Sequence, residues 1–594
     1  MTISFNEIPA GTRVPFVWAE FNAANAQQGP ALLTYRALLI GQKTAEGTAP
    51  ANSLQRVLSA DQALTLAGRG SMLHRQALAW FAANKSTEVW LGVLADNGAG
   101  VAAAGSLNMT GPANAAGTLS IYLGGQLVQV AVASGDTATV IAAAVASAIG
   151  RYASGTVTLS TVAVGDDVTV GVTAFIATAG AVTPGEATYS VDTSDNAAAS
   201  SLAAQINAHA AASLVAHATA SSAVVSLRAK SIGNSLALAT TDAVHAAVSG
   251  ATLTGYASTD LPVIAYAEAG VVTLIAKNTG ACGNEIDVRL NYRDTSEALP
   301  SGVAVVVGVM TSGATNPVLT SLITAMGDVW FHAIAHPYTD ATSLTSLEAE
   351  MASRSAAPRM IDGVAISAKA GTAVGALALG ASRNSPSNCI LFSGGIPNLP
   401  CEVAAGAAGI VAVSAAQDPA LPLQTLVIPG ILSPAQTDQL PWSTRDQLLR
   451  SGIATVVPSV DGTVALERLI TTYQRNAVGS PDVAYLDATT RFTLMYLRYS
   501  FVVRMARFAR YKLAHDGIQY AAGQAVMTPR MGKAEALAWF QDMINLALVE
   551  DLTQFKRDLV VEMDATDVNR LNFLLPPDLI NQLIGRAAKM SFLL

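Results

Sequence analysis

The C-terminal end of the chain has the clearest pattern of apolar and polar positions. Tyr485–Tyr511 places apolar residues at the spacing of a helix, with Asp487 at its start. A second helical pattern covers Lys533–Glu550. Its predicted buried face carries Leu537, Phe540, Ile544 and Leu548. After Lys556 the period changes from that of a helix to the period of two that is typical of strands.

Two apolar strands are predicted in this last stretch. In the first, Val561 and Met563 alternate with polar residues. The polar run Asp564–Asp567 then predicts a turn. The second strand carries Leu571, Phe573 and Leu575. Pro576 and Pro577 end that strand, because proline has no amide to donate to a ladder. An exposed apolar strand needs a ladder partner, and none is evident from the sequence around it.

The first residues have the same requirement. Residues 1–22 alternate like a strand, and we interpret them as an extended arm that is too short to form a core. Their apolar positions are Ile3, Phe5, Val14, Phe16 and Trp18.

Between these ends, segments 23–100 and 294–438 alternate between strand and helix patterns. Examples are the strand Tyr35–Gly41, the helix Ser71–Asn84, the strand Val329–Ala335 and the helix Glu402–Ala416. Such alternation predicts a partly parallel sheet covered by helices. The overall fold class is therefore α+β and α/β, in several domains, with a central α/β core, a C-terminal α+β domain with extended β-arms, and a β-rich insertion.

The predicted domain boundaries follow these changes of pattern. They are an arm at 1–22, core segments at 23–100 and 294–438, an insertion domain at 101–293, a C-terminal domain at 439–556, and C-terminal strands with an arm at 557–594.

The insertion domain contains a nested repeat. Val271–Lys277 resembles Val224–Lys230, and each copy is preceded by an Ala-rich helix pattern that an aspartate, Asp136 or Asp195, is expected to cap. The outer copy begins at Gly117, breaks near residue 150 and resumes near 261, so an inner copy at about 151–259 fills the gap. Insertion of one module into a loop of another explains this order.

Composition indicates extensive burial against partners. Only 13% of residues are charged while 51% are hydrophobic, which leaves little charge to solvate a monomer of 594 residues. The alternative interpretation is an alanine-rich genome. A net charge of −8 argues against nucleic acid as the main partner. The first ten residues lack a secretory signal, and the longest uncharged run, Pro300–Met326, is a poor membrane span.

The sequence supports no catalytic, cofactor or metal site. His332 and His336 have the spacing of two metal ligands on a helix but lie on a strand pattern, roughly 13 Å apart, so we expect them in the core or an interface. No nucleophile elbow or phosphate-binding loop follows any strand. The three cysteines are expected to be small core residues of a protein made in a reducing compartment. We therefore expect a protein that is not an enzyme and needs no cofactor.

Several arginines lie along the long helix pattern of the C-terminal domain. Paired with carboxylates of the same chain, they would be structural; unpaired, they would form a charged surface for an acidic partner. The candidates for that surface are Arg498, Arg504, Arg507 and Arg510.

Short sequence stretches distributed along the chain, taken in order, resemble the contractile tail sheath proteins of Mu-like phages and prophages. The resemblance covers nearly all of the chain except about 151–259. Its stretches are residues 4–9 (SFNEIP), 13–16 (RVPF), 284–292 (NEIDVRLNY), 314–317 (ATNP), 336–340 (HPYTD), 441–445 (PWSTR) and 574–578 (LLPPD).

The resemblance implies a sheath subunit that polymerises as stacked hexameric rings around a tail tube and contracts to drive the tube through a cell envelope. It implies self-association, contact with the tail tube, baseplate and tail terminator proteins, assembly in the host cytoplasm, and a place in the virion tail without nucleic acid or membrane insertion. The terminal arms would join neighbouring subunits by strand exchange, and the arginines above would face the tube. The expected inter-subunit contacts are Ile3, Phe5, Val14, Phe16, Trp18, Val561, Met563, Leu571, Phe573 and Leu575.

Alternatives remain at this point. Sheaths of phages, defective prophages, phage-derived bacteriocins and other contractile injection systems fit the pattern equally. From other classes, a secreted adhesin built of β-repeats would need a signal peptide, and an α/β hydrolase would need a nucleophile elbow. For a contracting sheath, the connections near Ala23–Pro30 and Asp551–Lys556 are the expected flexible linkers.

Overall fold

The computed structural model describes residues 33–191, 193–233, 235–293, 297–459, 461–518, 520 and 524–592. The chain divides into two compact units, one comprising 1–34 with 494–581 and the other comprising 35–493 with 582–594. The N-terminal arm predicted at 1–22 lies outside the described residues.

The larger unit is built on a six-stranded sheet in the order β2-β3-β1-β19-β20-β21. All neighbouring pairs are parallel except β2–β3. The strands are β1 (Arg36–Gln42), β2 (Ser53–Val57), β3 (Glu88–Leu94), β19 (Ala333–Ala335), β20 (Val364–Lys369) and β21 (Asn388–Phe392). The alternating sequence pattern predicted this α/β core, although β19 is shorter than the expected strand Val329–Ala335.

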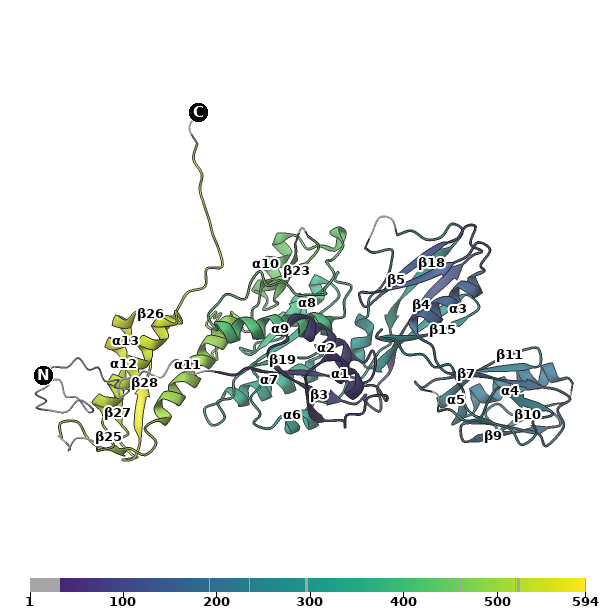
Figure 1. The fold of residues 1–594 in the computed structure, drawn as a ribbon, viewed down its shortest axis with the longest axis horizontal. Coiled ribbons are helices and arrows are strands. Elements are labelled where there is room, and N and C mark those ends of the chain that lie inside the picture. The colour runs from purple at the N-terminus through teal and green to yellow at the C-terminus, as the bar shows by residue number, and fades with distance from the viewer. Residues whose placement is uncertain are drawn as a thin grey trace, which may run out of the picture. The chain divides into compact units, whose positions relative to one another are not determined.

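Helices cover both faces of this sheet (Figure 1). They are α1 (Ala60–Ala67), α2 (Met72–Ala83), α6 (Thr320–Met326), α7 (Ala341–Ser355), α8 (Ala373–Ala381) and α9 (Pro400–Gln417). Leu38 and Ile40 of β1 pack in one cluster with residues of α6 and α7, while α2 and α9 pack against each other and the sheet. Helix α9 is long and apolar enough to cross a membrane, but 78% of it is buried within the protein, as a core helix is.

Elements that were predicted to begin the C-terminal domain belong to the larger unit instead. Helix α10 (Trp442–Arg450) places Leu448 in one apolar cluster with Ile390 of β21, and β22 (Thr455–Pro458) pairs with β23 (Val464–Arg468). The C-terminal unit starts at Leu494, not at 439. The loop after α9 includes a short 3-10 helix at Gln436–Asp438.

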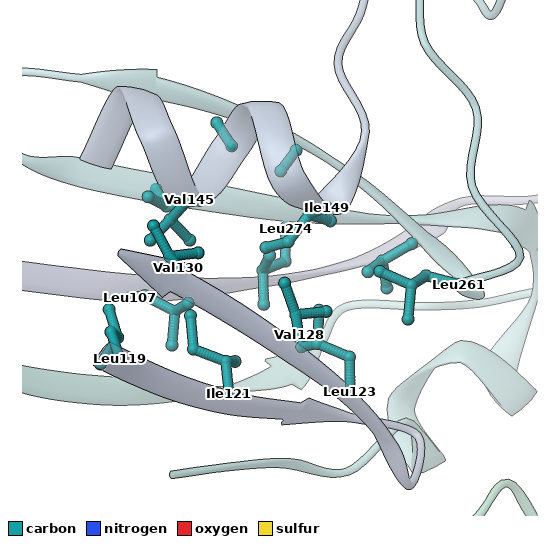
Figure 2. Close-up of a cluster of buried hydrophobic side chains, with 14 of the residues drawn as sticks. Leu107, Leu119, Ile121, Leu123, Val128, Val130, Val145, Ile149, Leu261 and Leu274 are labelled. Carbon is teal, nitrogen blue, oxygen red and sulfur yellow. The ribbon is translucent and has the colours of Figure 1, made fainter. Parts of the chain in front are cut away.

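The outer insertion module is a sandwich of two sheets and one helix. Its sheets have the orders β15-β16-β4-β18 and β17-β5-β6. The strands are β4 (Ala102–Thr110), β5 (Gly117–Leu123), β6 (Gln126–Val132), β15 (Val263–Glu268), β16 (Val271–Thr279), β17 (Val288–Leu290) and β18 (Ala304–Thr311), and the helices are α3 (Ala138–Ile149) and a 3-10 turn at Ala281–Glu285. Figure 2 shows Val145 and Ile149 of α3 above Leu107, Val130 and Leu274 of the strands.

The inner module repeats this order of elements. Its sheets are β11-β12-β7-β14 and β10-β9-β8-β13. The elements are β7 (Ser154–Leu159), β8 (Asp167–Val170), β9 (Thr173–Thr178), β10 (Thr188–Ser190), α4 (Asp195–Ala208), α5 (Ala212–Val215), β11 (Ala216–Ser221), β12 (Val224–Ala229), β13 (Leu238–Ala239) and β14 (Ala246–Val248).

Apart from the additional strand β10 and the short helix α5 of the inner module, the helix and strands of the two modules follow the same order. In the first sheet of each, the hairpin after the helix (β15–β16 or β11–β12) pairs with the module's first strand, which also pairs with its last strand. The repeated sequences Val271–Lys277 and Val224–Lys230 lie in the matching strands β16 and β12. The inner module enters the outer one between α3 and β15 and has a core of its own.

Two local expectations in these modules were wrong. Strand β18, which we placed in the second core segment, pairs with β4 and completes the outer module. The caps of α3 and α4 are Thr137 and Ser194, since their hydroxyls accept the third backbone N–H. Asp136 instead accepts the Ala133 N–H of the loop before α3, and Asp195 accepts the N–H groups of Thr161 and Val162 in the loop between β7 and β8.

Candidate inter-subunit surface in the C-terminal unit

The C-terminal unit is a small helical layer with a hairpin packed on it. It contains the end of α11 (Ala488–Ala506), α12 (Pro529–Asn545) and α13 (Leu552–Asp558), with β24 (Lys512–Leu513), β25 (Val526–Met527), β26 (Val549–Glu550), β27 (Val560–Met563), β28 (Leu571–Leu574) and β29 (Asp578–Leu579). Thr528 caps α12, and Pro529 occupies its first turn, where no amide donor is needed.

Aromatic rings join the helices of this unit. Phe501 of α11 meets Trp539 of α12 edge-on, with ring centroids 5.2 Å apart, and the Trp539 Nε1–H donates to Ser500 Oγ at 2.9 Å. Phe540 stacks on Phe555 of α13 at 3.8 Å. The buried face of α12 carries Gly532, Ala536, Trp539, Phe540 and Met543. Of the predicted face, Phe540 is buried in the helix and Leu548 is buried beyond its end, while Leu537 and Ile544 are half-buried.

Strands β27 and β28 form an antiparallel hairpin. Val561 lies opposite Phe573, and Met563 lies opposite Leu571. The turn is organised by Asp564, whose carboxylate accepts hydrogen bonds from Asn572, Thr566 and the Asp567 backbone. These bonds, led by that of Asn572, hold the pKa of Asp564 well below its usual range. The predicted turn and the end of β28 before Pro576 are confirmed.

One face of the hairpin packs on the helices. A Cβ at Gly532 of α12 would lie 3.0 to 3.2 Å from side-chain atoms of Leu571, Phe573 and Val561, so a larger residue there would have to displace the hairpin side chains slightly. Phe573 also meets Phe501 edge-on at 5.4 Å. The side chains of Val561, Leu571 and Phe573, which we expected at a subunit interface, therefore pack inside the same chain.

Their backbone groups point elsewhere. The Asp564 N–H donates to the Arg570 carbonyl, so the alternation of an antiparallel ladder makes 562–572 and 560–574 the hydrogen-bonded pairs. The pairs between them, 561–573 and 563–571, are not bonded to each other. Their N–H and C=O groups point out of the two edges of the hairpin; the residues are Val561, Met563, Leu571 and Phe573. Within the described residues, no further strand pairs with either edge.

This arrangement corrects part of the sequence interpretation. The C-terminal strands were expected to lack a partner in their own chain, yet they pair with each other, because the turn at Asp564 folds them back. Leu575 lies just beyond β28 and is half-buried. Ile3, Phe5, Val14, Phe16 and Trp18 lie outside the described residues.

The outer face of the hairpin exposes two apolar residues that the sequence analysis missed. Val560 is 45% exposed and Leu574 is 62% exposed, and they lie opposite each other. The sequence did contain a signal for this face, since Val560 and Leu574 alternate with the residues that face α12. The two adjacent leucines, Leu574 and Leu575, made it hard to tell which of them faces outward.

Two of the four candidate arginines pair with carboxylates of the same chain. Arg504 binds Glu535 and Asp542 of α12 at 3.0 and 2.7 Å, and Arg507 binds Glu535 at 3.3 Å. Such pairs within one chain are what we expect of arginines with a structural role. Arg510 is exposed beyond the end of the helix, and Arg498 is half-buried.

The expected linker near Asp551–Lys556 is helix instead. Asp551 adopts a left-handed conformation (φ 51°) and caps α13, accepting from the Gln554 N–H at 2.9 Å. The other expected linker, Ala23–Pro30, lies outside the described residues. In the larger unit, residues 582–592 contain no helix or strand, and the side chains of Met590 and Phe592 are 92% and 83% exposed.

Comparison with known proteins identifies similar chains. The family model of the phage tail sheath protein central domain matches residues 312–472, which begin directly after β18. The Mu-like prophage FluMu tail sheath protein of Haemophilus influenzae is 31% identical over 595 residues, covering 100% of both chains. Among solved structures, sheath tail proteins of Desulfitobacterium hafniense and Listeria innocua each align with 11% identity and a TM-score of 0.40, covering 95% and 94% of this chain and 100% and 95% of theirs.

Proposed function

This chain belongs to the family of Mu-like prophage tail sheath proteins, and we propose that it is the subunit of a contractile tail sheath. The observation that carries this proposal is the identity of 31% along the full length of both chains. The subunit is a structural part of a virion tail. In the proposed assembly it forms stacked rings of six around a tail tube and meets baseplate and terminator proteins at the ends.

The hairpin β27–β28 is the proposed joint between subunits. Among the described residues both edges of this two-stranded sheet are open, with N–H and C=O groups that no other described strand pairs, and such edges bind a further strand by β-augmentation. The arm at 1–22 of one neighbour and the C-terminal tail of another are the proposed strands. Backbone bonding by Val561, Met563, Leu571 and Phe573 would then coexist with their side-chain packing on α12.

Val560 and Leu574 give this joint an apolar contact. They lie on the face turned away from α12, where the alternate side chains of an added strand would extend the same surface. The apolar arm positions Ile3, Phe5, Val14, Phe16 and Trp18 are the proposed counterparts. Leu575, at the end of β28, would lie at the rim.

The tube contact is proposed for the arginine surface of α11. Arg510 would supply most of its charge, because Arg504 and Arg507 both pair with carboxylates of α12, although Arg507 is 46% exposed. Arg498 is the fourth member. An acidic strip on the tube would be the complementary surface.

Contraction is proposed to draw its free energy from assembly. The subunits would move as rigid bodies from a metastable extended arrangement to one with more buried contact. Burial is worth roughly 25 cal/mol per Å², so a few hundred Å² gained per subunit would release several kcal/mol before ordering costs. We assign the chain no catalytic activity and no cofactor, and propose assembly in the host cytoplasm.

Sedimentation velocity of the purified full chain tests self-assembly. A sheath subunit is expected to give large, concentration-dependent species. A monomer at every concentration and salt would contradict the proposal.

A further inference from the structure

A cavity of about 270 Å³ lies where the inner module meets the outer one. Residues of α3 and β15 line it from the outer module, and residues of β7, β11 and β12 line it from the inner module. Two arginines face this space. Arg151 lies between α3 and β7, where the chain passes from one module to the other, and Arg228 lies on β12.

Aromatic rings hold the Arg228 guanidinium in place. Its central carbon lies 3.5 Å from the ring centroid of Tyr266 on β15 and 5.6 Å from that of Tyr152. Stacking on a ring gives the N–H groups of the guanidinium no acceptor, and arginine carries five of them. Among the described residues Arg228 has no hydrogen-bond acceptor or ion-pair partner for its side chain, and its Nε–H is buried without an acceptor. The position of this arginine is therefore explained, but its hydrogen-bonding capacity is unused.

Hydroxyl groups line the same cavity. They come from four different elements, and none of them hydrogen-bonds to a described residue: Ser147 of α3, Ser154 of β7, Thr219 of β11 and Ser226 of β12. Arg151 donates its Nε–H to the Gly255 carbonyl at 2.9 Å and forms no ion pair with a described carboxylate. The cavity thus gathers donors and positive charge without the acceptor that such groups normally have.

One carboxylate shares the lining. Glu268 of β15 lies 3.5 Å from the Nε2 atom of His217 on β11, and its side chain is 48% exposed. Two arginines against one carboxylate leave the lining with a net positive charge. A ligand that satisfies these groups has to be an anion rich in acceptor oxygens.

We propose that this cavity binds a phosphate group, either of inorganic phosphate or of a small phosphate ester. The planar guanidinium fork matches two phosphate oxygens, and hydroxyls can donate to the others. A carboxylate offers two oxygens and would leave most of the donors unused. Because the donors belong to both modules, the bound group would fix the inner module on the outer one. This role is separate from the proposed joint between subunits.

Calorimetric titration of the full chain with inorganic phosphate, glucose 6-phosphate and citrate tests this inference. We expect one saturable site per chain for phosphate, for the ester or for both, and at least tenfold weaker binding after Arg228→Met. Glu268→Gln should bind more tightly, because it removes the one carboxylate of the lining. Arg56→Met is the matched control, since it removes an exposed arginine of the core sheet (3.6 Å from Glu88) and should leave the affinity unchanged.

Phosphorus-31 resonance spectra of phosphate with the unaltered chain avoid dependence on folding of the variants. The phosphate line is expected to broaden when the chain is added and to recover with excess sulfate, a competing tetrahedral anion. A line that the chain does not change, equal affinity of the unaltered chain and a folded Arg228→Met variant, no gain in Glu268→Gln, or tighter binding of citrate than of either phosphate compound would each overturn the assignment. Arg228 would then be a structural contact between the modules and nothing more.

Discussion

Val561 of β27 lies directly opposite Phe573 of β28, and both residues pack their side chains on Gly532 while their backbone groups face the open edges of the hairpin. One residue pair thus serves two surfaces. The core of the unit uses the side chains, which leaves the amides for a strand from another subunit.

The edge of β27 is tested by a pair of substitutions at one position. Val561→Pro and Val561→Ala both remove the side chain from its contact with α12, but only proline removes the outward N–H. We expect Val561→Pro to abolish polymer in sedimentation and Val561→Ala to keep most of it. Equal assembly by two folded variants, judged by circular dichroism, would show that this edge binds no strand.

The outer face of the hairpin is tested by charge. Leu574→Glu should weaken assembly at least tenfold without lowering the thermal transition, because the side chain is exposed in the subunit. Val568→Glu introduces the same charge at an exposed apolar residue of the neighbouring turn and is the control. If both variants assemble alike, the face formed by Val560 and Leu574 is not a contact.

A buried ion pair fixes α2 to α9. Arg75 and Glu402 are 2.6 Å apart with side chains 5% and 4% exposed. Glu402→Ala should cost about 3 to 5 kcal/mol of unfolding free energy, because it leaves a buried charge unpaired, while Arg75→Met with Glu402→Leu should recover most of it. Denaturant unfolding measures both, and Asp446→Ala, at an exposed pair, should change little. Destabilisation by the double variant equal to that of Glu402→Ala would contradict this account.

Three buried histidines make stability depend on pH. Burial lowers the pKa of His74, His332 and His336 to about 4. The unfolded chain takes up protons near pH 6.5, so stability is complete above that value and falls as the pH drops towards 4, by about 2 kcal/mol per histidine at pH 5. His336→Gln should reduce the loss between pH 7.5 and 5 in denaturant unfolding. His515→Gln, at an exposed residue, should not, and an unchanged loss in His336→Gln would contradict the argument.

The inner module is expected to be dispensable for assembly. Its two ends lie together, since Arg151 and Ala257 exchange backbone hydrogen bonds of 3.0 Å and the Ala265 N–H donates to the Gly150 carbonyl. Replacing 151–259 by a short glycine linker should leave the outer module folded and sedimentation unchanged. Loss of polymer in a folded deletion chain would mean that the module makes essential contacts between subunits.

Sequence patterns predicted the elements that are covered on both faces and those that repeat along the chain. The central strands read as apolar runs because both of their faces are covered, and the repeated strands β12 and β16 were visible as similar sequences. Strand β18 was assigned to the wrong domain, since its valines occupy both faces and no alternation marks a partner. Its neighbour, β4, is nearly 200 residues away in the chain.

The candidate interface was predictable only in part. Alternation identified Val561, Met563, Leu571 and Phe573 as one face, but which surface receives that face depends on Gly532 and on the turn at Asp564. The apolar residues of α12 form two possible faces at helical spacing, and the sequence alone does not say which is buried. In the folded unit the buried face is the one that carries Trp539 and Met543. The left-handed cap at Asp551, which turns an expected linker into α13, has no signal in hydrophobic periodicity.

Cryo-electron microscopy of the polymer formed by the purified full chain tests the central claim most directly. We expect a tubular helical assembly in which each β27–β28 hairpin carries an added strand of a neighbouring subunit on at least one edge. Particles that remain monomeric, or a polymer in which both edges of the hairpin face solvent, would contradict it.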